Sequence, residues 1–146
     1  MILDTTYLLP LARIGVKTDL LKAIADARVT KPSLDEVKVS LISLFELQAK
    51  ATKLGIPPHH TAKAVNAILK ALPVIPFYRA DVIARAQELY NVLRDYVDSV
   101  IVATAVVLGE DLVTEDTVIH RHRGLIEREH GIRILKYDDL VSPSFR

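Results

Sequence analysis

The stretch DSVIVATAVVLGEDLVTED, residues 98–116, places a long apolar segment directly before a short one that ends in acids. Residues 98–109 are apolar on nearly every side, which is typical of a helix buried against a sheet. Their β-branched residues are compatible with a strand, but the length, the alanines and the closing Gly109 favour a helix. Residues 111–116 then resemble a strand that ends in acids. The stretch therefore predicts one helix-strand unit of an α/β protein.

The rest of the chain repeats this alternation. Because strand and helix follow one another along the chain, we expect a central, mainly parallel sheet with helices on both faces, a three-layer α/β/α architecture in one domain spanning residues 1–146. The strands are expected at residues 1–3, 37–43, 74–77 (an edge strand, because of its proline) and 132–137. The other helices are expected from Thr5 to near Gly15 and at residues 19–27, 44–55, 61–72, 80–93 and 117–129.

The composition excludes several classes of protein. The 146 residues include no cysteine, which excludes a disulfide framework, an iron-sulfur cluster, a thiolate zinc site and a cysteine nucleophile. The net charge of +1 does not mark the whole chain as a nucleic-acid binder. No apolar run approaches the length of a membrane span, and the first residues lack a basic leader. We expect a cytoplasmic protein without a membrane partner.

Four acids from four segments fall where a parallel sheet binds ligands, at the carboxyl ends of strands or the starts of helices. Asp4 and Asp116 each end a strand, and a functional role is favoured for both because an acid stabilises a sheet little. Asp98 begins the buried helix, where capping by it or by Asp95 is an equal alternative. For Glu46, in the first turn of its helix, the spacing alone favours a capping box with Ser43.

The charge balance around residues 93–116 favours a metal site. Six carboxylates stand there against one base, Arg94. Carboxylates brought together raise one another's pKa unless a cation lies between them. Oxygen ligands without cysteine point to Mg²⁺ or Mn²⁺ and not to zinc.

The residues resemble the PIN-domain ribonucleases, and most closely the VapC-type toxins of toxin-antitoxin pairs. The resemblance covers nearly the whole chain and rests on ILDTTYLL, SLFELQAKA, the 98–116 stretch and the closing GIRILKYDDL. It implies a PIN-like fold and a catalytic set formed by Asp4, Glu46, Asp98 and Asp116. Of these, the three aspartates are implied to hold the metal while Glu46 orients a water molecule. Thr6 departs from the family pattern, because many relatives have asparagine there.

The resemblance implies roles for two further residues. The hydroxyl of Thr114 is a candidate helper beside the metal. Asp95 stands one helical turn before Asp98, either as an extra ligand or as a helix cap, and the cap is favoured.

The implied activity is Mg²⁺- or Mn²⁺-dependent hydrolysis of RNA phosphodiester bonds, with a small antitoxin protein as partner and a homodimer as the assembly. The alternatives are an RNA-processing nuclease outside a toxin system and a non-catalytic protein-binding module of the same fold. An aspartate-nucleophile phosphatase is set aside, because Thr6 stands where that chemistry needs an acid.

The RNA needs a basic surface, and residues 117–136 hold five Lys or Arg against two Glu. This segment is a candidate phosphate-binding face, although a solvated helix face with internal ion pairs explains it equally well. His120 and His122 are candidate metal ligands for which a surface loop is favoured, and His59 and His60 are expected in a turn before a helix.

Overall fold

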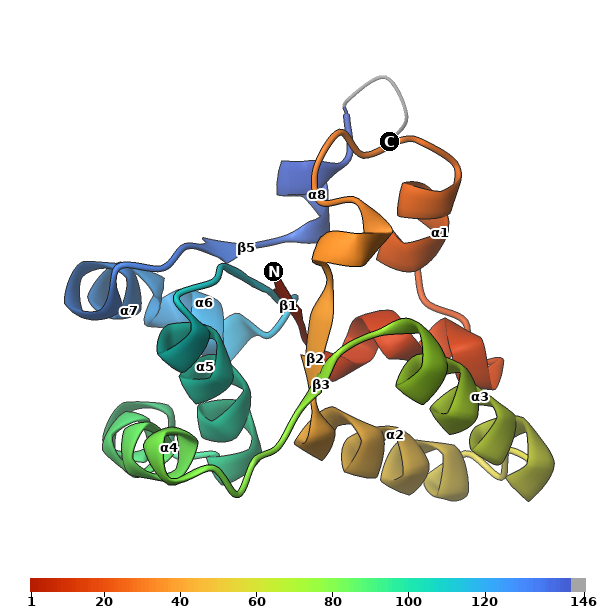
Figure 1. Ribbon diagram of the computed structural model, residues 1–146, viewed down its shortest axis with the longest axis horizontal. Coiled ribbons are helices and arrows are strands. Elements are labelled where there is room, and N and C mark those ends of the chain that lie inside the picture. Colours follow the sequence, from red (N-terminus) through yellow and green to blue (C-terminus); the bar gives the residue numbers. More distant parts are fainter. Residues whose placement is uncertain (143–146) are drawn as a thin grey trace.

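The computed structural model of the protein describes residues 1–142 and contains a central five-stranded sheet (Figure 1). Every neighbouring pair of strands is parallel, in the order β3-β2-β1-β4-β5. The strands are β1 (Ile2–Leu3), β2 (Lys38–Ser40), β3 (Val74–Ile75), β4 (Leu112–Val113) and β5 (Ile134–Leu135). The parallel sheet is confirmed, and so is the edge position of β3. The last four residues included in the single-domain prediction lie outside the described residues.

Helices cover both faces of the sheet, as the three-layer prediction requires. Figure 1 shows α4, α5, α6 and α7 on one side of the strands and the N-terminal 3₁₀ helix η1, α2 and α3 on the other. The helices are η1 (Thr5–Ala12), α1 (Leu20–Ala25), η2 (Leu34–Glu36), α2 (Leu41–Lys53), α3 (Pro58–Ala71), α4 (Ala80–Leu93), α5 (Tyr96–Leu108), α6 (Thr117–Arg121), α7 (Arg123–His130) and α8 (Tyr137–Leu140).

The strands contribute side chains to two separate apolar cores, because successive side chains of a strand point to opposite faces of the sheet. Ile2 and Leu112 pack with α4 and α5, whereas Leu3 and Val113 pack with η1 and α2. The register aligns Ile2 with Leu112 and Leu3 with Val113 across the β1-β4 pair. β1 is therefore buried on both faces in the middle of the sheet, and the residue that follows it is held in place from both sides.

The helix predicted from the 98–116 stretch is confirmed as α5. Residues 99–105 are all buried, as expected for a helix that is apolar around its circumference. Gly109 ends the helix in the left-handed conformation (φ +63°), which a glycine adopts without strain. The helix begins at Tyr96, two residues before Asp98, because Asp95 is its N-cap.

Several boundaries differ from the prediction. The expected strand at 37–43 ends at Ser40, which caps α2, so residues 41–43 are already helical. The segment from Thr5 forms a 3₁₀ helix with Pro10 inside it, and it ends at Ala12 before Gly15. The basic helix expected at 117–129 is two helices, α6 and α7. The last strand is shorter than 132–137, because residues 137–140 form α8. Within the described residues, no helix is long and apolar enough to cross a membrane.

Candidate active site

Asp4 follows β1 at the carboxyl end of the sheet and is only 7% exposed. Its Oδ1 accepts a hydrogen bond from the backbone N–H of Thr5 (2.7 Å), which caps η1. Its Oδ2 accepts one from the Oγ1 of Thr114 (2.5 Å) on the neighbouring strand. An unpaired charge buried here would be costly. The two donors fix the carboxylate at this edge, and each oxygen keeps a further lone pair for a ligand.

Thr114 connects Asp4 to Asp116. Its hydroxyl donates to Asp4 and accepts a hydrogen bond from the backbone N–H of Asp116 (3.0 Å). This geometry follows from the parallel pairing of β1 with β4, which sets the residues after the two strands side by side. The residue is fully buried, and the two hydrogen bonds of its hydroxyl connect the two acids.

Asp116 is the N-cap of α6. Its Oδ1 accepts the backbone N–H of Ile119 (2.9 Å), a role that the functional interpretation of this residue did not include. The cap uses one carboxylate oxygen, so the other oxygen remains available to a ligand.

Glu46 lies in the second turn of α2, not in the first. The N-cap of α2 is Ser40, whose Oγ accepts the N–H of Ile42 (3.2 Å). The capping box proposed between Ser43 and Glu46 is therefore wrong, and the buried Ser43 hydroxyl has no hydrogen-bond partner among the described residues. The Oε1 of Glu46 instead accepts a hydrogen bond from the Oγ1 of Thr5 (2.6 Å).

Asp95 and Asp98 have different roles at the start of α5. Asp95 caps α5 by accepting the backbone N–H of Asp98 (2.9 Å). Asp98 itself is in the first turn of α5, and the cap leaves its carboxylate free to face the other acids. The capping role favoured for Asp95 is confirmed, and the one considered for Asp98 is not what the structure shows.

The four acids meet in one cleft of about 300 Å³ at the carboxyl edge of the sheet. The cleft is lined by Asp4, Thr5, Thr6, Glu46, Lys50, Asp95, Asp98, Glu115 and Asp116. They come from η1, α2, the start of α5 and the end of β4, four segments far apart in the sequence. A larger and more apolar cavity of about 570 Å³ lies between α2 and α3, but it has no acid in its wall.

Crowding and burial raise the pKa values of two of these acids. Burial is the main cause of the shift at Asp98, followed by repulsion from Asp116, Asp95, Asp4 and Glu46, and together they raise its pKa to about 7. Burial also raises the pKa of Asp4, although the hydrogen bonds from Thr114 and Thr5 oppose the shift. The cleft therefore favours the binding of a cation.

A family model for the PIN domain matches residues 1–125 of the chain. The chain belongs to the PIN domain family. PIN domains are typically nucleases, so an acidic cleft at the sheet edge has a chemical purpose in this family. Comparison with curated protein sequences gave no significant match.

Solved structures share this PIN fold. A toxin-antitoxin complex from Klebsiella pneumoniae is 24% identical with a TM-score of 0.59, and the match covers 80% of this chain and 86% of the other. VapBC2 from Rickettsia felis, bound to a promoter DNA fragment, is 18% identical (TM-score 0.61, 92% and 96% covered). FitAcB from Neisseria gonorrhoeae is 18% identical (TM-score 0.64, 95% and 99% covered). At these identities the likeness shows the fold alone.

The residues in the cleft of this PIN domain fit a hydrated divalent cation. In residues 1–142 no three acidic or histidine side chains are grouped closely enough to enclose an ion as they stand. Mg²⁺ does not need such a cage, because it keeps several waters and takes one or two carboxylates directly. None of Asp4, Glu46, Asp98 and Asp116 takes part in an ion pair within the described residues. Hard oxygen donors without a cationic partner are the set that such an ion prefers.

None of the five histidines is among the residues that line the cleft. His120 is in α6, and its Nε2 is 2.7 Å from the backbone oxygen of Thr114. The surface loop favoured for the pair is therefore wrong for His120, whereas His122 lies in the turn between α6 and α7. His59 and His60 form the first turn of α3 and not a turn before it.

The PIN-domain cleft also contains residues that the sequence analysis missed. Thr5 positions Glu46, and Lys50 lines the cleft from α2. Glu115 stands between Thr114 and Asp116 in the chain. Its Oε2 accepts hydrogen bonds from the hydroxyl of Tyr7 (2.5 Å) and the N–H of Tyr137 (2.9 Å), although the residue still borders the cleft. The i, i+4 spacing of Glu46 and Lys50 is a signal that could have found the lysine.

Proposed function

We propose that this PIN domain is a divalent-metal-dependent ribonuclease and the toxin of a VapBC-type toxin-antitoxin pair. The observation that carries the proposal is the meeting of Asp4, Glu46, Asp98 and Asp116 in one cleft without a paired cation. Such a cluster is a poor choice for stability, because like charges at close range repel. It suits a site that holds a cation next to a phosphate.

The chemistry proposed is hydrolysis of RNA phosphodiester bonds. When bound, Mg²⁺ or Mn²⁺ would lower the pKa of a water molecule and neutralise charge developing on the phosphate. Asp4, Asp98 and Asp116 would hold the ion through their remaining lone pairs. Glu46 would orient the attacking water and accept its proton, since the Thr5 hydroxyl occupies only one of its two oxygens.

The proposed partner is a small antitoxin protein, and the proposed assembly is a homodimer in the cytoplasm. One similar structure is a toxin-antitoxin complex and another is VapBC2 bound to promoter DNA, which supports a partner of that kind. An antitoxin would have to keep RNA out of the cleft, either by covering it or by supplying a cation of its own to the free acids.

The first experiment is RNA cleavage by the purified full chain. Labelled single-stranded RNA is incubated with the wild type and with Asp98→Asn, purified in parallel, in Mg²⁺, in Mn²⁺ and in chelator. Cleavage that needs the metal and disappears in the variant supports the nuclease. Equal cleavage by both proteins would mean a contaminating nuclease, and metal-independent cleavage would contradict the mechanism.

The toxin assignment has a separate test. Induction of the wild type should stop bacterial growth, induction of Asp98→Asn should not, and the product of the adjacent small gene should relieve the arrest and co-purify with the chain. Metal-dependent cleavage without growth arrest would favour an RNA-processing enzyme. Growth arrest by both proteins would contradict a nuclease toxin.

A further inference from the structure

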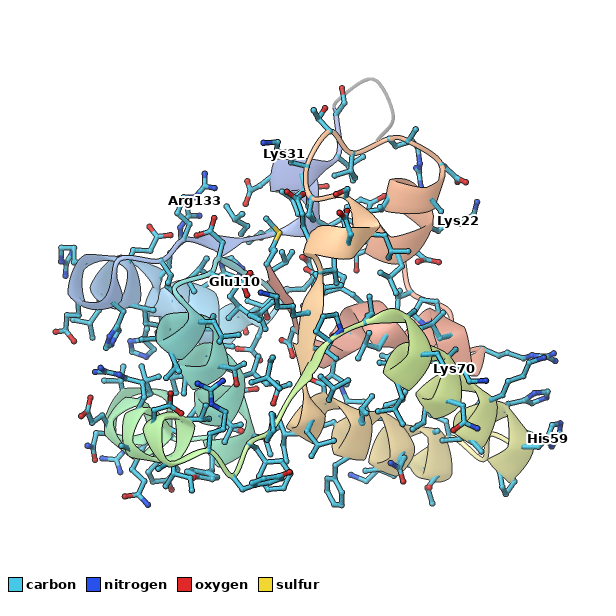
Figure 2. The ribbon with its side chains drawn as sticks, in the orientation of Figure 1. Lys22, Lys31, His59, Lys70, Glu110 and Arg133 are labelled. Atoms are coloured by element: carbon cyan, nitrogen blue, oxygen red, sulfur yellow. The ribbon has the colours of Figure 1, made fainter. Side chains whose placement is uncertain are left out.

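The hairpin formed by α2 and α3 is basic on an otherwise acidic chain. Between Glu46 and Asp81 the sequence holds no Asp or Glu, but it holds Lys50, Lys53, Lys63 and Lys70 in α2 and α3, and Arg79 just before α4, where it pairs with Asp81. The rest of the chain carries the other 14 Lys and Arg against all 18 Asp and Glu. In Figure 2 the labelled side chains His59 and Lys70 both project from α3 on this side of the molecule. Positive charge is therefore concentrated on one element of the fold.

Two of these lysines continue directly from the cleft. Lys50 and Lys53 follow Glu46 by four and seven residues, so the three side chains share one face of α2. Lys50 lines the cleft beside Glu46, and both lysines are exposed. The face spans about 10 Å along the helix axis from Glu46 to Lys53. It is distinct from the face that carries Gln48 and Thr52, which borders the apolar cavity towards α3.

These lysines are not neutralised within the protein. Glu46 has the spacing for an ion pair with Lys50, but its carboxylate is held by Thr5 instead. Neither Lys50 nor Lys53 takes part in an ion pair among the described residues. In the basic segment at 117–136, by contrast, two of the five cations are paired, Arg123 with Glu127 and Arg133 with Asp111.

Positive charge also lies near the tip of the α2-α3 hairpin. The pKa of His60 is lowered by partial burial first and then by the positive charges of Arg13, His59 and Lys63. Arg13 ends η1, and the other three residues belong to the first two turns of α3. Arg13 and Lys63 therefore place positive charge near the tip of the hairpin.

We infer that single-stranded RNA reaches the cleft along α2, with its backbone phosphates on Lys50 and Lys53 and the tip of the α2-α3 hairpin attracting the strand. The inference rests on the proposed nuclease function. An RNA strand suits the face better than an acidic protein does. Lys50 belongs to both the basic face and the cleft, so a ligand bound along this face has to extend into the acidic cleft. A strand of phosphates meets that requirement, and a basic groove that tracks the backbone is how such strands are bound.

The test is the salt dependence of RNA binding. A fluorescently labelled single-stranded RNA of mixed sequence is titrated with the Asp98→Asn chain, which should not cleave it, in Mg²⁺ at several salt concentrations. In that background Lys50→Gln with Lys53→Gln should weaken binding at low salt. It should reduce the slope of log K against log salt by about 1.4, since each phosphate contact to a single strand contributes about 0.7. The matched control, Lys17→Gln with Lys31→Gln, replaces two exposed lysines outside the hairpin that form no ion pair among the described residues, and it should leave the slope unchanged.

A second measurement separates folding from binding. Glutamine is as good a helix former as lysine, so the melting temperature of the α2 double variant should match the control. In the active background the single variant Lys53→Gln, at a residue that does not line the cleft, should raise KM for RNA more than it lowers kcat. An unchanged slope and KM with intact metal-dependent cleavage would overturn the inference and spare the proposed function. The inference would also be overturned if the α2 variant kept its RNA slope but lost the antitoxin, which would make this face a protein-binding surface. A wild-type protein that neither binds nor cleaves RNA would contradict both the inference and the proposed function.

Discussion

Replacing Glu46 by Gln tests the proposed chemistry, because the structure leaves this residue without a helix-capping role. Its only hydrogen bond within the described residues is the one accepted from the Thr5 hydroxyl at 2.6 Å. Glutamine keeps an oxygen at that position, so the Thr5 contact survives. What disappears is the negative charge, together with the ability to accept a proton.

The expected effect on stability is small. A hydrogen bond to a charged group stabilises a protein by about 1.5 to 3 kcal/mol and a neutral one by about 0.5 to 1.5, so the swap costs about 1 kcal/mol. Repulsion of Glu46 with the buried Asp4 and the half-buried Asp98 disappears at the same time, which offsets part of this loss. For a chain of this length the melting temperature should change by less than about 4 °C.

The expected effect on cleavage is large. Loss of a general base slows a reaction by about 100-fold or more, so Glu46→Gln should abolish most Mg²⁺-dependent RNA cleavage. Melting temperature and cleavage are measured on the same sample, with Glu88→Gln as a control on an exposed face of α4. Near-native cleavage by Glu46→Gln would refute the role proposed for Glu46 and leave a site of three aspartates.

Three further variants test the rest of the cleft. Asp116→Asn should keep the α6 cap, because asparagine caps as well as aspartate, but should lose Mn²⁺ affinity in a calorimetric titration; equal affinity would remove Asp116 from the ligands. Thr114→Val should lower the free energy of unfolding in urea by about 1 to 3 kcal/mol, because it leaves a buried oxygen of Asp4 unpaired, and Thr114→Ser should restore most of it; a neutral valine variant would contradict the connection between the strands. Asp95→Ala should cost about 1 kcal/mol of stability with cleavage largely kept, and a loss of cleavage at unchanged stability would make Asp95 a ligand.

The architecture was predictable because it depends on patterns that local sequence carries. The alternation of strands with helices specifies parallel pairing, and the apolar circumference of residues 98–109 specifies a helix between sheet and helix layer. The boundaries were less accessible. The apolar-polar alternation of residues 37–43 continues past the true end of β2, and only Ser40, a good N-cap residue, indicates that a helix starts there.

The site was predictable where an acid follows a strand or precedes a helix, because the sequence alone shows that position. Asp4 stands out because a charge that follows a short apolar strand gains nothing from the sheet. Glu46 was harder, since its spacing from Ser43 fits a capping box that α2 does not use. The contacts of Thr5 with Glu46 and of Thr114 with Asp4 join residues 41 and 110 positions apart, and no local pattern indicates them. They depend on how η1, α2 and β4 pack together.

Capping and function are not alternatives at this site. Asp4 caps η1, Asp116 caps α6, and Asp95 caps the helix that presents Asp98. At Asp116 the cap uses one carboxylate oxygen and leaves the other without a hydrogen bond among the described residues, whereas at Asp4 the second oxygen accepts a hydrogen bond from Thr114. A helix N-terminus also stabilises negative charge by about 0.3 to 1 kcal/mol, which offsets part of the repulsion between the acids while no cation is bound. Backbone N–H groups therefore hold Asp4 and Asp116 in the cleft. The Thr5 hydroxyl holds Glu46, and Asp98 is presented by the helix that Asp95 caps.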